Sequence, residues 1–373
     1  MGGVMDDSQA RVLLGLWFEA GDRALGSRVA THTAITVVEE ILAGRSPLAE
    51  AARPRMQAQP NVEEHLTKVW TAAERVGARF VVPGGSEWPR QLDDLGLEAP
   101  LGLWVCGAGD MRLLALRSVA IVGARAATAY GESVARELGA HLSDGGWLTV
   151  SGGAFGIDAA AHRGALAAGG ATACVLAGGV DVPYPRSHVE LLAVIRERGV
   201  LISETPLGGA AMRHRFLTRN RIIAALSRGT VVVEAAVRSG GLTTARRARD
   251  LRRVVMAVPG PVTSPMSAGC HRLIREGDAL ITCSPREVTA LMTGQISMEA
   301  ESDPHAGSGA DALGWREKRI LDAVPVRRSA PLANLARVAG IGTTEAMVAL
   351  GTLDALGLIR REGQGWVRAS ASQ

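Results

Sequence analysis

Two short glycine turns carry the residue types that hold phosphate groups in proteins. Gly123-Ala124-Arg125 follows an apolar run at 119–122, and Ser151-Gly152-Gly153 follows a second run at 147–150. Glycine lets backbone N–H groups approach an anion, and the N-terminus of a helix after the turn adds partial positive charge. Arg125 supplies a formal charge beside the first turn. The two turns therefore predict a site for a nucleotide or a nucleic acid.

Two common kinds of nucleotide site are excluded by motifs that the sequence lacks. It contains neither GxxxxGKS nor GxxxxGKT, which argues against a P-loop nucleoside triphosphatase. It also contains no GxGxxG, and Ser151 and Gly152 stand where a dinucleotide-binding strand would end in an acidic residue for the ribose. We therefore expect neither a triphosphatase nor a nicotinamide dehydrogenase.

Arginine is concentrated between residues 213 and 253. The stretch holds eleven arginines against only Glu234 and Asp250, although the net charge of the whole chain is only +4. Because it falls in the same α/β region as the glycine turns, we expect it along the same sheet edge, in contact with an anionic polymer. The arginines are Arg213, Arg215, Arg219, Arg221, Arg228, Arg238, Arg246, Arg247, Arg249, Arg252 and Arg253.

Acid–base catalysis is another use that this region could serve. Asp158 and His162 lie four residues apart on the helix expected after the second turn, so they share a face. We interpret Asp158 as a local cap or ion-pair partner and His162 as a residue that packs against the sheet. Glu204 and Glu234 stand at strand ends, but the sequence places no nucleophile–base constellation or metal-ligand cluster around them. We therefore expect no metal and no cofactor at these residues.

The elements that position these residues are those of an α/β core. Short apolar runs alternate with helical stretches, which is typical of a parallel sheet with right-handed crossovers, where ligands bind beyond the carboxyl ends of the strands. Capping boxes at 187–190 and 284–287 indicate two helix starts, and Tyr184-Pro185 indicates a rigid loop. Strands are expected at 119–122, 147–150, 171–179, 200–203, 230–235, 254–260 and near 280, with edge strands at 79–82 and 103–106.

Further segments flank the core, which extends over 79–293. Residues 1–78 predict a small helical domain, and the polar residues 294–314 predict a flexible linker. Residues 315–373 predict three helices and a hairpin, a small winged-helix-like module of a kind that binds DNA or protein. No apolar run has membrane-spanning length, no export signal is visible, and the four cysteines form no CxxC pair, so we expect a cytoplasmic protein with reduced thiols.

Eight sequence strings, in order, resemble one known family. They are VAIVGAR, the YG at 130–131, SGGAFGIDAAAHRGAL, the YP at 184–185, ISETP, RNRIIAALS, VVVEAAVRSGGLTTA and AVPG. The resemblance covers 79–292 and is to the DNA-processing protein A family, DprA, also called Smf. It implies an extended Rossmann-like core, with a SAM-like helical domain before it and a winged-helix domain after it.

The resemblance implies binding rather than catalysis. Members of the family bind single-stranded DNA without sequence preference and load RecA recombinase onto it in recombination and natural transformation. Many members form homodimers through the core. Arginines and glycine turns would hold consecutive phosphates, and one aromatic ring would stack on a splayed base. Carried over by position, the DNA site would consist of Arg125, Ser151, Gly152, Gly153, Arg213, Phe216, Arg219, Asn220 and Arg221.

Two alternatives from other classes remain open. A nucleotide-processing enzyme of the phosphoribohydrolase type shares the wider fold and a turn like SGGA, but it would need a catalytic glutamate and a closed mononucleotide pocket. A pure protein-interaction scaffold would use the arginines only for solubility. The arginine stretch and the additional C-terminal module favour the DNA-binding interpretation.

Overall fold

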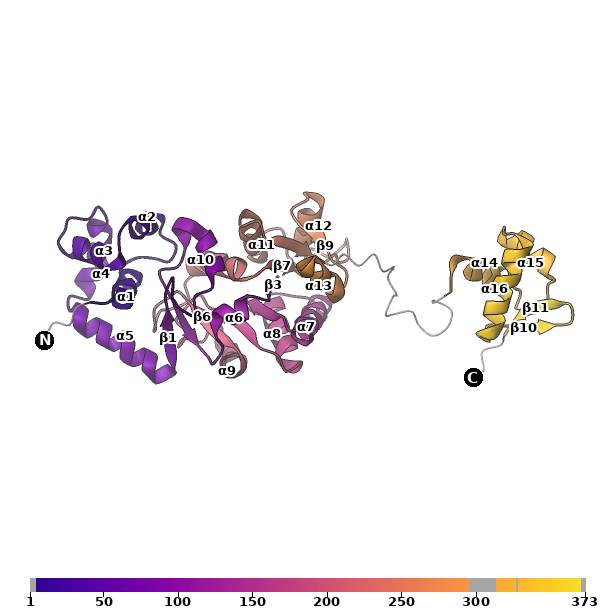
Figure 1. Ribbon diagram of the computed structural model, residues 1–373, viewed down its shortest axis with the longest axis horizontal. Coiled ribbons are helices and arrows are strands. Elements are labelled where there is room, and N and C mark those ends of the chain that lie inside the picture. The colour runs from indigo at the N-terminus through magenta and orange to yellow at the C-terminus, as the bar shows by residue number, and fades with distance from the viewer. Residues whose placement is uncertain (1–4, 295–312, 327, 370–373) are drawn as a thin grey trace. The chain divides into compact units, whose positions relative to one another are not determined.

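The computed structural model describes residues 5–294, 313–326 and 328–369 (Figure 1). Contacts divide the chain into two units, Met1–Ile296 and Ser297–Gln373. The predicted linker at 294–314 lies outside the described residues, except for its ends. Within the described ranges, no helix is long and apolar enough to cross a membrane.

One mixed sheet organises the first unit. Within the described residues it has nine strands in the order β1-β2-β6-β5-β4-β3-β7-β8-β9. Strands from β6 to β9 along this order pair in parallel, whereas β1 and β2 extend the β6 edge with antiparallel pairing. The strands are β1 (Ala78–Val81), β2 (Leu103–Cys106), β3 (Ser118–Val122), β4 (Leu148–Ser151), β5 (Thr172–Val175), β6 (Val200–Ser203), β7 (Gly229–Val232), β8 (Val254–Ala257) and β9 (Leu280–Ile281).

Helices cover both faces of this sheet, which is why its strands are apolar runs rather than alternating patterns. Every residue of β3 is buried: Ala120 and Val122 pack toward α10, α11 and α12, and Val119 and Ile121 pack toward α7, α8 and α13. The helices are α6 (Met111–Ala115), α7 (Ala129–Asp144), α8 (Ile157–Ala167), α9 (Val189–Arg198), α10 (Arg213–Leu226), α11 (Gly241–Asp250), α12 (Ala268–Arg275) and α13 (Pro285–Thr293), with 3-10 turns at Arg90–Glu98 and Arg186–His188.

The N-terminal helices pack against one end of the sheet. Trp17 and Val38 share a hydrophobic core with Trp104 of β2 and Leu192 of α9, and Figure 1 shows these helices beside β1. The segment predicted to be a separate helical domain therefore contacts the core closely, and its boundary at residue 78 stays a prediction. The helices are α1 (Asp7–Trp17), α2 (Arg23–Thr31), α3 (Ala34–Leu42), α4 (Ala49–Ala58) and α5 (Val62–Val76).

Ser284 caps α13 as predicted, but without the reciprocal bond of a full capping box. Its hydroxyl accepts a hydrogen bond from the Glu287 N–H at 3.3 Å, whereas the Glu287 carboxylate accepts from the Cys283 N–H at 2.9 Å. The box predicted at 187–190 is wrong, because a 3-10 turn precedes α9 and moves the cap position to His188, whose side chain makes no cap bond.

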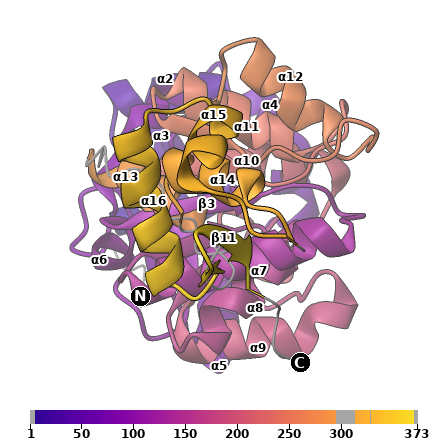
Figure 2. The ribbon, with the colours of Figure 1, turned by 90° about the vertical axis from the view of Figure 1, so that its right-hand side faces the viewer.

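The second unit has its own core. It contains α14 (Trp315–Ala323), α15 (Leu332–Ala339), α16 (Thr343–Ala355) and a hairpin of β10 (Ile359–Glu362) and β11 (Gly365–Arg368). Ile320, Leu335, Leu350 and Ile359 form the centre of this core, and Figure 2 shows the three helices grouped beside β11. The predicted helices and hairpin are confirmed as elements, and their interpretation as a winged helix stays a prediction.

Candidate nucleic-acid interface

Residues from three strand ends and one helix meet at a single edge of the sheet. Because β3, β4 and β5 are adjacent and parallel, the segments that follow them leave the sheet on the same side. Arg125 follows β3, Phe155 follows β4 and Tyr184 follows β5, while Phe216 lies in the first turns of α10. We call this side of the sheet the carboxyl edge, and the opposite side, where these strands begin, the amino edge.

Phe216 lies between a cation and a second ring. The guanidinium carbon of Arg125 is 4.9 Å from the centre of the Phe216 ring, and the Tyr184 ring centre is 5.3 Å from it on a tilted plane. The negative face of an aromatic ring attracts a guanidinium, so this contact holds the two side chains together. Arg125 is exposed and Phe216 is half-buried. The carboxyl edge therefore presents a positive charge and a π face side by side.

Two more arginines at this edge are exposed. Arg213 is the first residue of α10, and Arg238 lies in the loop after β7. Among the described residues, no carboxylate lies within ion-pair distance of Arg125, Arg213 or Arg238. Their charges are therefore available to an external anion.

The amides of the second glycine turn already have a partner. The Asp158 carboxylate accepts hydrogen bonds from the N–H groups of Gly152 at 3.1 Å and Ala154 at 3.4 Å. The buried Ser151 hydroxyl donates to the Ile121 carbonyl at 2.6 Å. In this conformation the turn fixes the start of α8, and contact of Ser151, Gly152 and Gly153 with phosphate stays a prediction.

The N-terminus of α7, after the first turn, is also closed by a carboxylate of the chain. Glu234 accepts from the Thr128 N–H at 2.9 Å and from the Thr128 hydroxyl at 2.7 Å. A Cβ on Gly131 would lie 2.2 Å from a Glu234 carboxylate oxygen, so only glycine leaves room for this cap. Because this is the point where the strand order reverses between β3 and β7, the crevice that binds nucleotides in many α/β proteins is filled by Glu234.

Three of the predicted DNA contacts on α10 are buried. Arg221 is 1% exposed and pairs with Glu204 at 2.8 Å, so in this conformation it is a structural residue that a DNA strand does not reach. The Asn220 amide donates to the Gly240 carbonyl at 3.4 Å. Arg219 donates to the Val175 carbonyl; burial lowers the pKa of its guanidinium, and the nearby Asp158 carboxylate opposes that shift.

The prediction that the whole arginine stretch lies along one edge is wrong. Arg228 directly precedes β7, and Arg252 and Arg253 precede β8, so these residues stand at the amino edge. Several others are neutralised by acidic residues from distant segments. The ion pairs are Arg215–Glu19, Arg247–Glu98, Arg249–Asp278 and Arg253–Asp94.

The sequence profile of the family described as DNA recombination-mediator protein A matches residues 79–293, more than half of the chain. This chain belongs to that family. The DNA recombination-mediator family includes a DNA processing protein DprA of Mycobacterium tuberculosis that is 44% identical over 311 residues, which cover 80% of this chain and 79% of that protein. The resemblance to DprA and Smf is therefore confirmed.

Solved structures of the same family share the fold. The DNA processing protein A of Streptococcus pneumoniae has a TM-score of 0.65 at 30% identity and covers 77% of this chain and 98% of its own. A second solved structure concerns the single-stranded DNA binding mode of the DNA processing protein A of Helicobacter pylori. It has a TM-score of 0.52 at 25% identity, and the match covers 58% of this chain and 96% of that one. These structures confirm the extended Rossmann-like α/β core.

The pair Asp158 and His162 is not arranged for catalysis in this family member. Asp158 holds the second turn, as described, and burial raises the pKa of its carboxyl group despite the nearby Arg219. His162 is fully buried, with its Nδ1 2.8 Å from the Thr172 hydroxyl, and burial lowers its pKa to about 3. The interpretation that Asp158 pairs locally and that His162 packs against the sheet is confirmed, although the N-cap of α8 is Gly156 and not Asp158.

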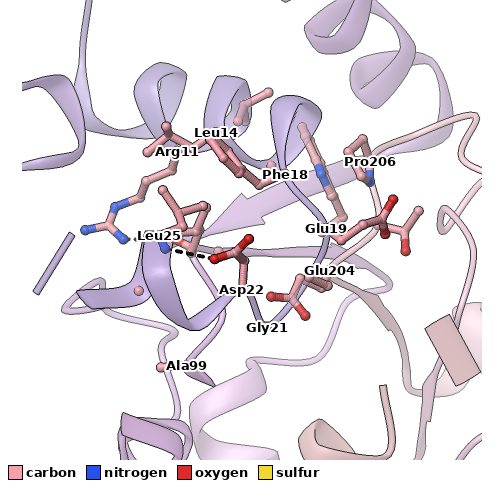
Figure 3. Close-up of a pocket in the computed structure, with 18 of the residues that line it drawn as sticks. Arg11, Leu14, Phe18, Glu19, Gly21, Asp22, Leu25, Ala99, Glu204 and Pro206 are labelled. Carbon is pink, nitrogen blue, oxygen red and sulfur yellow. Dashed lines mark hydrogen bonds between the residues drawn. The ribbon is translucent and has the colours of Figure 1, made fainter. Parts of the chain in front are cut away.

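A pocket next to the carboxyl edge is lined by acidic, basic and apolar side chains. It lies between α1, the loop before α2 and the end of β6, where Phe18 and Leu25 form apolar walls. Figure 3 shows the carboxylates of Glu19, Asp22 and Glu204 in this pocket. Arg11 and Arg215 also line the pocket. Glu19 pairs with Arg215, and Glu204 pairs with Arg221, so the pocket is of mixed charge.

Glu19 connects the N-terminal helices to α10. It forms ion pairs with Arg55 at 2.5 Å, Arg215 at 3.1 Å and His214 at 3.2 Å. Partial burial alone would raise the pKa of Glu19, but hydrogen bonds from Arg215 and His214 and the charges of Arg215 and Arg55 lower it to about 2. The ionised carboxylate therefore anchors the start of α10, next to Arg213 and Phe216.

Sequence reasoning missed Phe155 and Tyr184 as surface residues of this edge. The sequence pattern indicates only a rigid loop at Tyr184, yet its side chain is 44% exposed and contacts Phe216. Phe155 is 48% exposed in the turn after β4. A usable signal is present, because the chain has only two tyrosines and four phenylalanines, and these two fall in loops at predicted strand ends.

Proposed function

We propose that this protein binds single-stranded DNA without sequence preference at its carboxyl edge. The observation that carries the proposal is the exposed Arg125 guanidinium, 4.9 Å from the centre of the Phe216 ring. A strand that crosses this edge can place a phosphate against the guanidinium and a base against the ring. The single-stranded DNA binding described for the H. pylori family member supports the same proposal.

We divide the nine predicted site residues into two roles. Arg125, Arg213 and Phe216 are the direct contacts, because their side chains reach the surface. The others hold the shape of the edge from below, through the hydrogen bonds and the ion pair described above. They are Ser151, Gly152, Gly153, Arg219, Asn220 and Arg221.

Binding at this edge is expected to be strongly salt-dependent. The log affinity for oligo(dT) should fall linearly with log salt concentration, by roughly 0.7 for each phosphate neutralised. Arg125→Ala should make the slope shallower by about 0.7 and weaken oligo(dT) and oligo(dC) equally, because phosphate contacts carry no base information. Fluorescence anisotropy with labelled oligonucleotides at several salt concentrations measures both effects.

Arg228→Ala is the matched control. Arg228 is also exposed, and no acidic residue of the described chain pairs with it, but it stands at the amino edge. Its loss should leave affinity and slope close to those of the wild-type protein. If the wild-type protein does not bind oligo(dT) at low salt, the proposed function is refuted. If Arg125→Ala and Arg228→Ala change binding equally, the carboxyl edge is not the binding surface.

We further propose that the protein acts in the cytoplasm as a homodimer that loads RecA onto single-stranded DNA. The description of the family as a recombination mediator supports this step. On an oligonucleotide coated with single-strand-binding protein, RecA filaments should form faster when this protein is present. Equal rates with and without it would contradict loading, and sedimentation velocity measures the oligomeric state.

A phosphoribohydrolase-type enzyme is the competing function, and we propose that the protein is not one. One observation speaks against it: Glu234 fills the crevice at the start of α7, where many α/β proteins bind a nucleotide. Release of free base from a nucleoside monophosphate by the purified protein would favour the enzyme instead.

A further inference from the structure

Aromatic side chains are concentrated at the carboxyl edge far beyond what the composition of the chain would suggest. Aromatic residues make up only 3% of the sequence. In the described part of the first unit, the aromatic side chains that are more than a third exposed are Tyr130, Phe155 and Tyr184, at 43%, 48% and 44%. Each follows or contacts the carboxyl end of a strand. Single exposed apolar residues are common, but a cluster on one edge indicates a binding surface.

Tyr130 and Tyr184 have partners that account for their positions. The Tyr130 hydroxyl donates to the Pro259 carbonyl at 2.7 Å, which ties α7 to the loop after β8. The Tyr184 ring contacts Phe216 and widens the π surface beside Arg125. Phe155 is different, because neither the arginine–phenylalanine contact nor the hydrophobic core includes it.

Phe155 is nevertheless held in a fixed orientation. One side of its ring packs on His188, with ring centres 4.7 Å apart and planes at 62°. His188 is itself 5% exposed, and its Nδ1 lies 3.0 Å from the Gly153 carbonyl in the same turn. A buried, hydrogen-bonded imidazole thus supports one part of the ring, while nearly half of the Phe155 side chain faces solvent. Such a ring is preorganised, so little side-chain entropy is lost when a planar group packs on it.

We propose that Phe155, backed by His188, is a second base-stacking platform of the single-stranded DNA site. This inference rests on the proposed function and assigns a path to the strand. One base would stack at Phe216 and Tyr184, and a neighbouring base would stack at Phe155, so the strand would cross the carboxyl ends of β3, β4 and β5. These strands are adjacent, and strands in a sheet are about 4.8 Å apart, a step that a flexible single strand can follow.

Stacking on Phe155 accounts for a property that arginines alone do not supply. Phosphate contacts do not distinguish single-stranded DNA from duplex DNA, because both carry the same backbone charge. Two rings at one edge require two unpaired bases, so they would select single strands. Stacking also tolerates every base, because each has a π face, so selection of single strands comes without sequence preference.

The test combines Phe155→Ala with a series of oligonucleotides of equal length. Each oligonucleotide carries a single abasic residue, at a different position in each. The affinity of every oligonucleotide is measured for the wild-type protein and for the variant. Phe155→Ala is expected to weaken the intact oligonucleotide about fivefold to a hundredfold. At one position the abasic residue should weaken wild-type binding but cause no further loss in the variant, because the base and the ring are then both absent.

Leu113→Ala is the matched control, since Leu113 is a 59% exposed apolar side chain on α6, before β3 at the amino edge. It should bind every oligonucleotide as the wild type does. If wild-type protein binds the oligonucleotides but Phe155→Ala binds them equally well and shows the same abasic profile, the second platform is refuted and the proposed function stands. If wild-type protein binds none of them, the proposed function fails and this inference fails with it.

Discussion

Replacement of Phe216 by alanine is expected to reduce the affinity for single-stranded oligonucleotides by roughly tenfold to a hundredfold. The Phe216 ring contributes in three ways. It is half-buried and is proposed to stack on a base, its centre lies 5.3 Å from that of the Tyr184 ring, and it holds the Arg125 guanidinium at 4.9 Å. Loss of the ring therefore removes a stacking platform and also frees the arginine that is proposed to hold the adjacent phosphate.

The measurement is equilibrium binding of a labelled oligonucleotide, with Phe216→Tyr as the control because it keeps the ring. Phe216→Tyr should bind nearly as the wild type does. In a double-mutant cycle, Arg125→Ala and Phe216→Ala should be less than additive, since each single change disturbs the same contact. If Phe216→Ala binds the oligonucleotide as tightly as the wild-type protein does, or if the two losses are fully additive, then Arg125 and Phe216 do not act as a unit.

The sheet was predictable because its strands are buried on both faces. A strand that is covered on both faces consists mainly of apolar residues, so runs such as 119–122 and 200–203 are visible without any alignment. Parallel strands also end at one edge, which allowed the glycine turns to be placed together. In the second unit, the helix periods and the Glu362–Gly365 turn predicted the three helices and the hairpin.

The partners of the charged groups were not predictable, because they depend on contacts between distant segments. Glu234 caps Thr128 across 106 positions of sequence, and Arg215 pairs with Glu19 across 196. A glycine turn with free amides and one with amides already bound to a carboxylate have the same sequence pattern. For the same reason, the arginines could be counted from the sequence but not assigned to an edge.

The exposure of individual side chains could also not be predicted from the sequence. Arg219 and Arg221 flank Asn220 in a motif that looks like a cluster of surface cations, yet all three are buried at the base of the site. Phenylalanine is a commonly buried residue type, yet nearly half of the Phe155 side chain is exposed. Burial follows from which helix covers which part of the sheet edge, and that is set by tertiary packing rather than by local pattern.

The proposed site depends on a rigid frame, and the close contact between α7 and α8 is one part of it. These helices begin just after the turns that carry Arg125 and Phe155. They approach so closely that a Cβ on Gly164 would lie 2.0 Å from the Arg136 carbonyl oxygen, and one on Gly139 would lie 2.3 Å from the Ala161 carbonyl oxygen. Both obstacles are backbone atoms, which no side-chain rotation can remove.

Gly164→Ala is therefore expected to destabilise the protein by about 2 to 3 kcal/mol, because the two helices must separate to admit the methyl group. Gly15→Ala is the matched control: Gly15 also lies inside a helix of the same unit, but nothing stands within 4 Å of the place that its methyl group would take. Alanine there should stabilise the protein by roughly 0.5 to 1 kcal/mol, through the lower entropy of the unfolded chain. Urea unfolding followed by circular dichroism measures both changes. A Gly164→Ala protein as stable as Gly15→Ala would mean that the two helices can move apart at little cost, and their contact would then not be a rigid part of the frame.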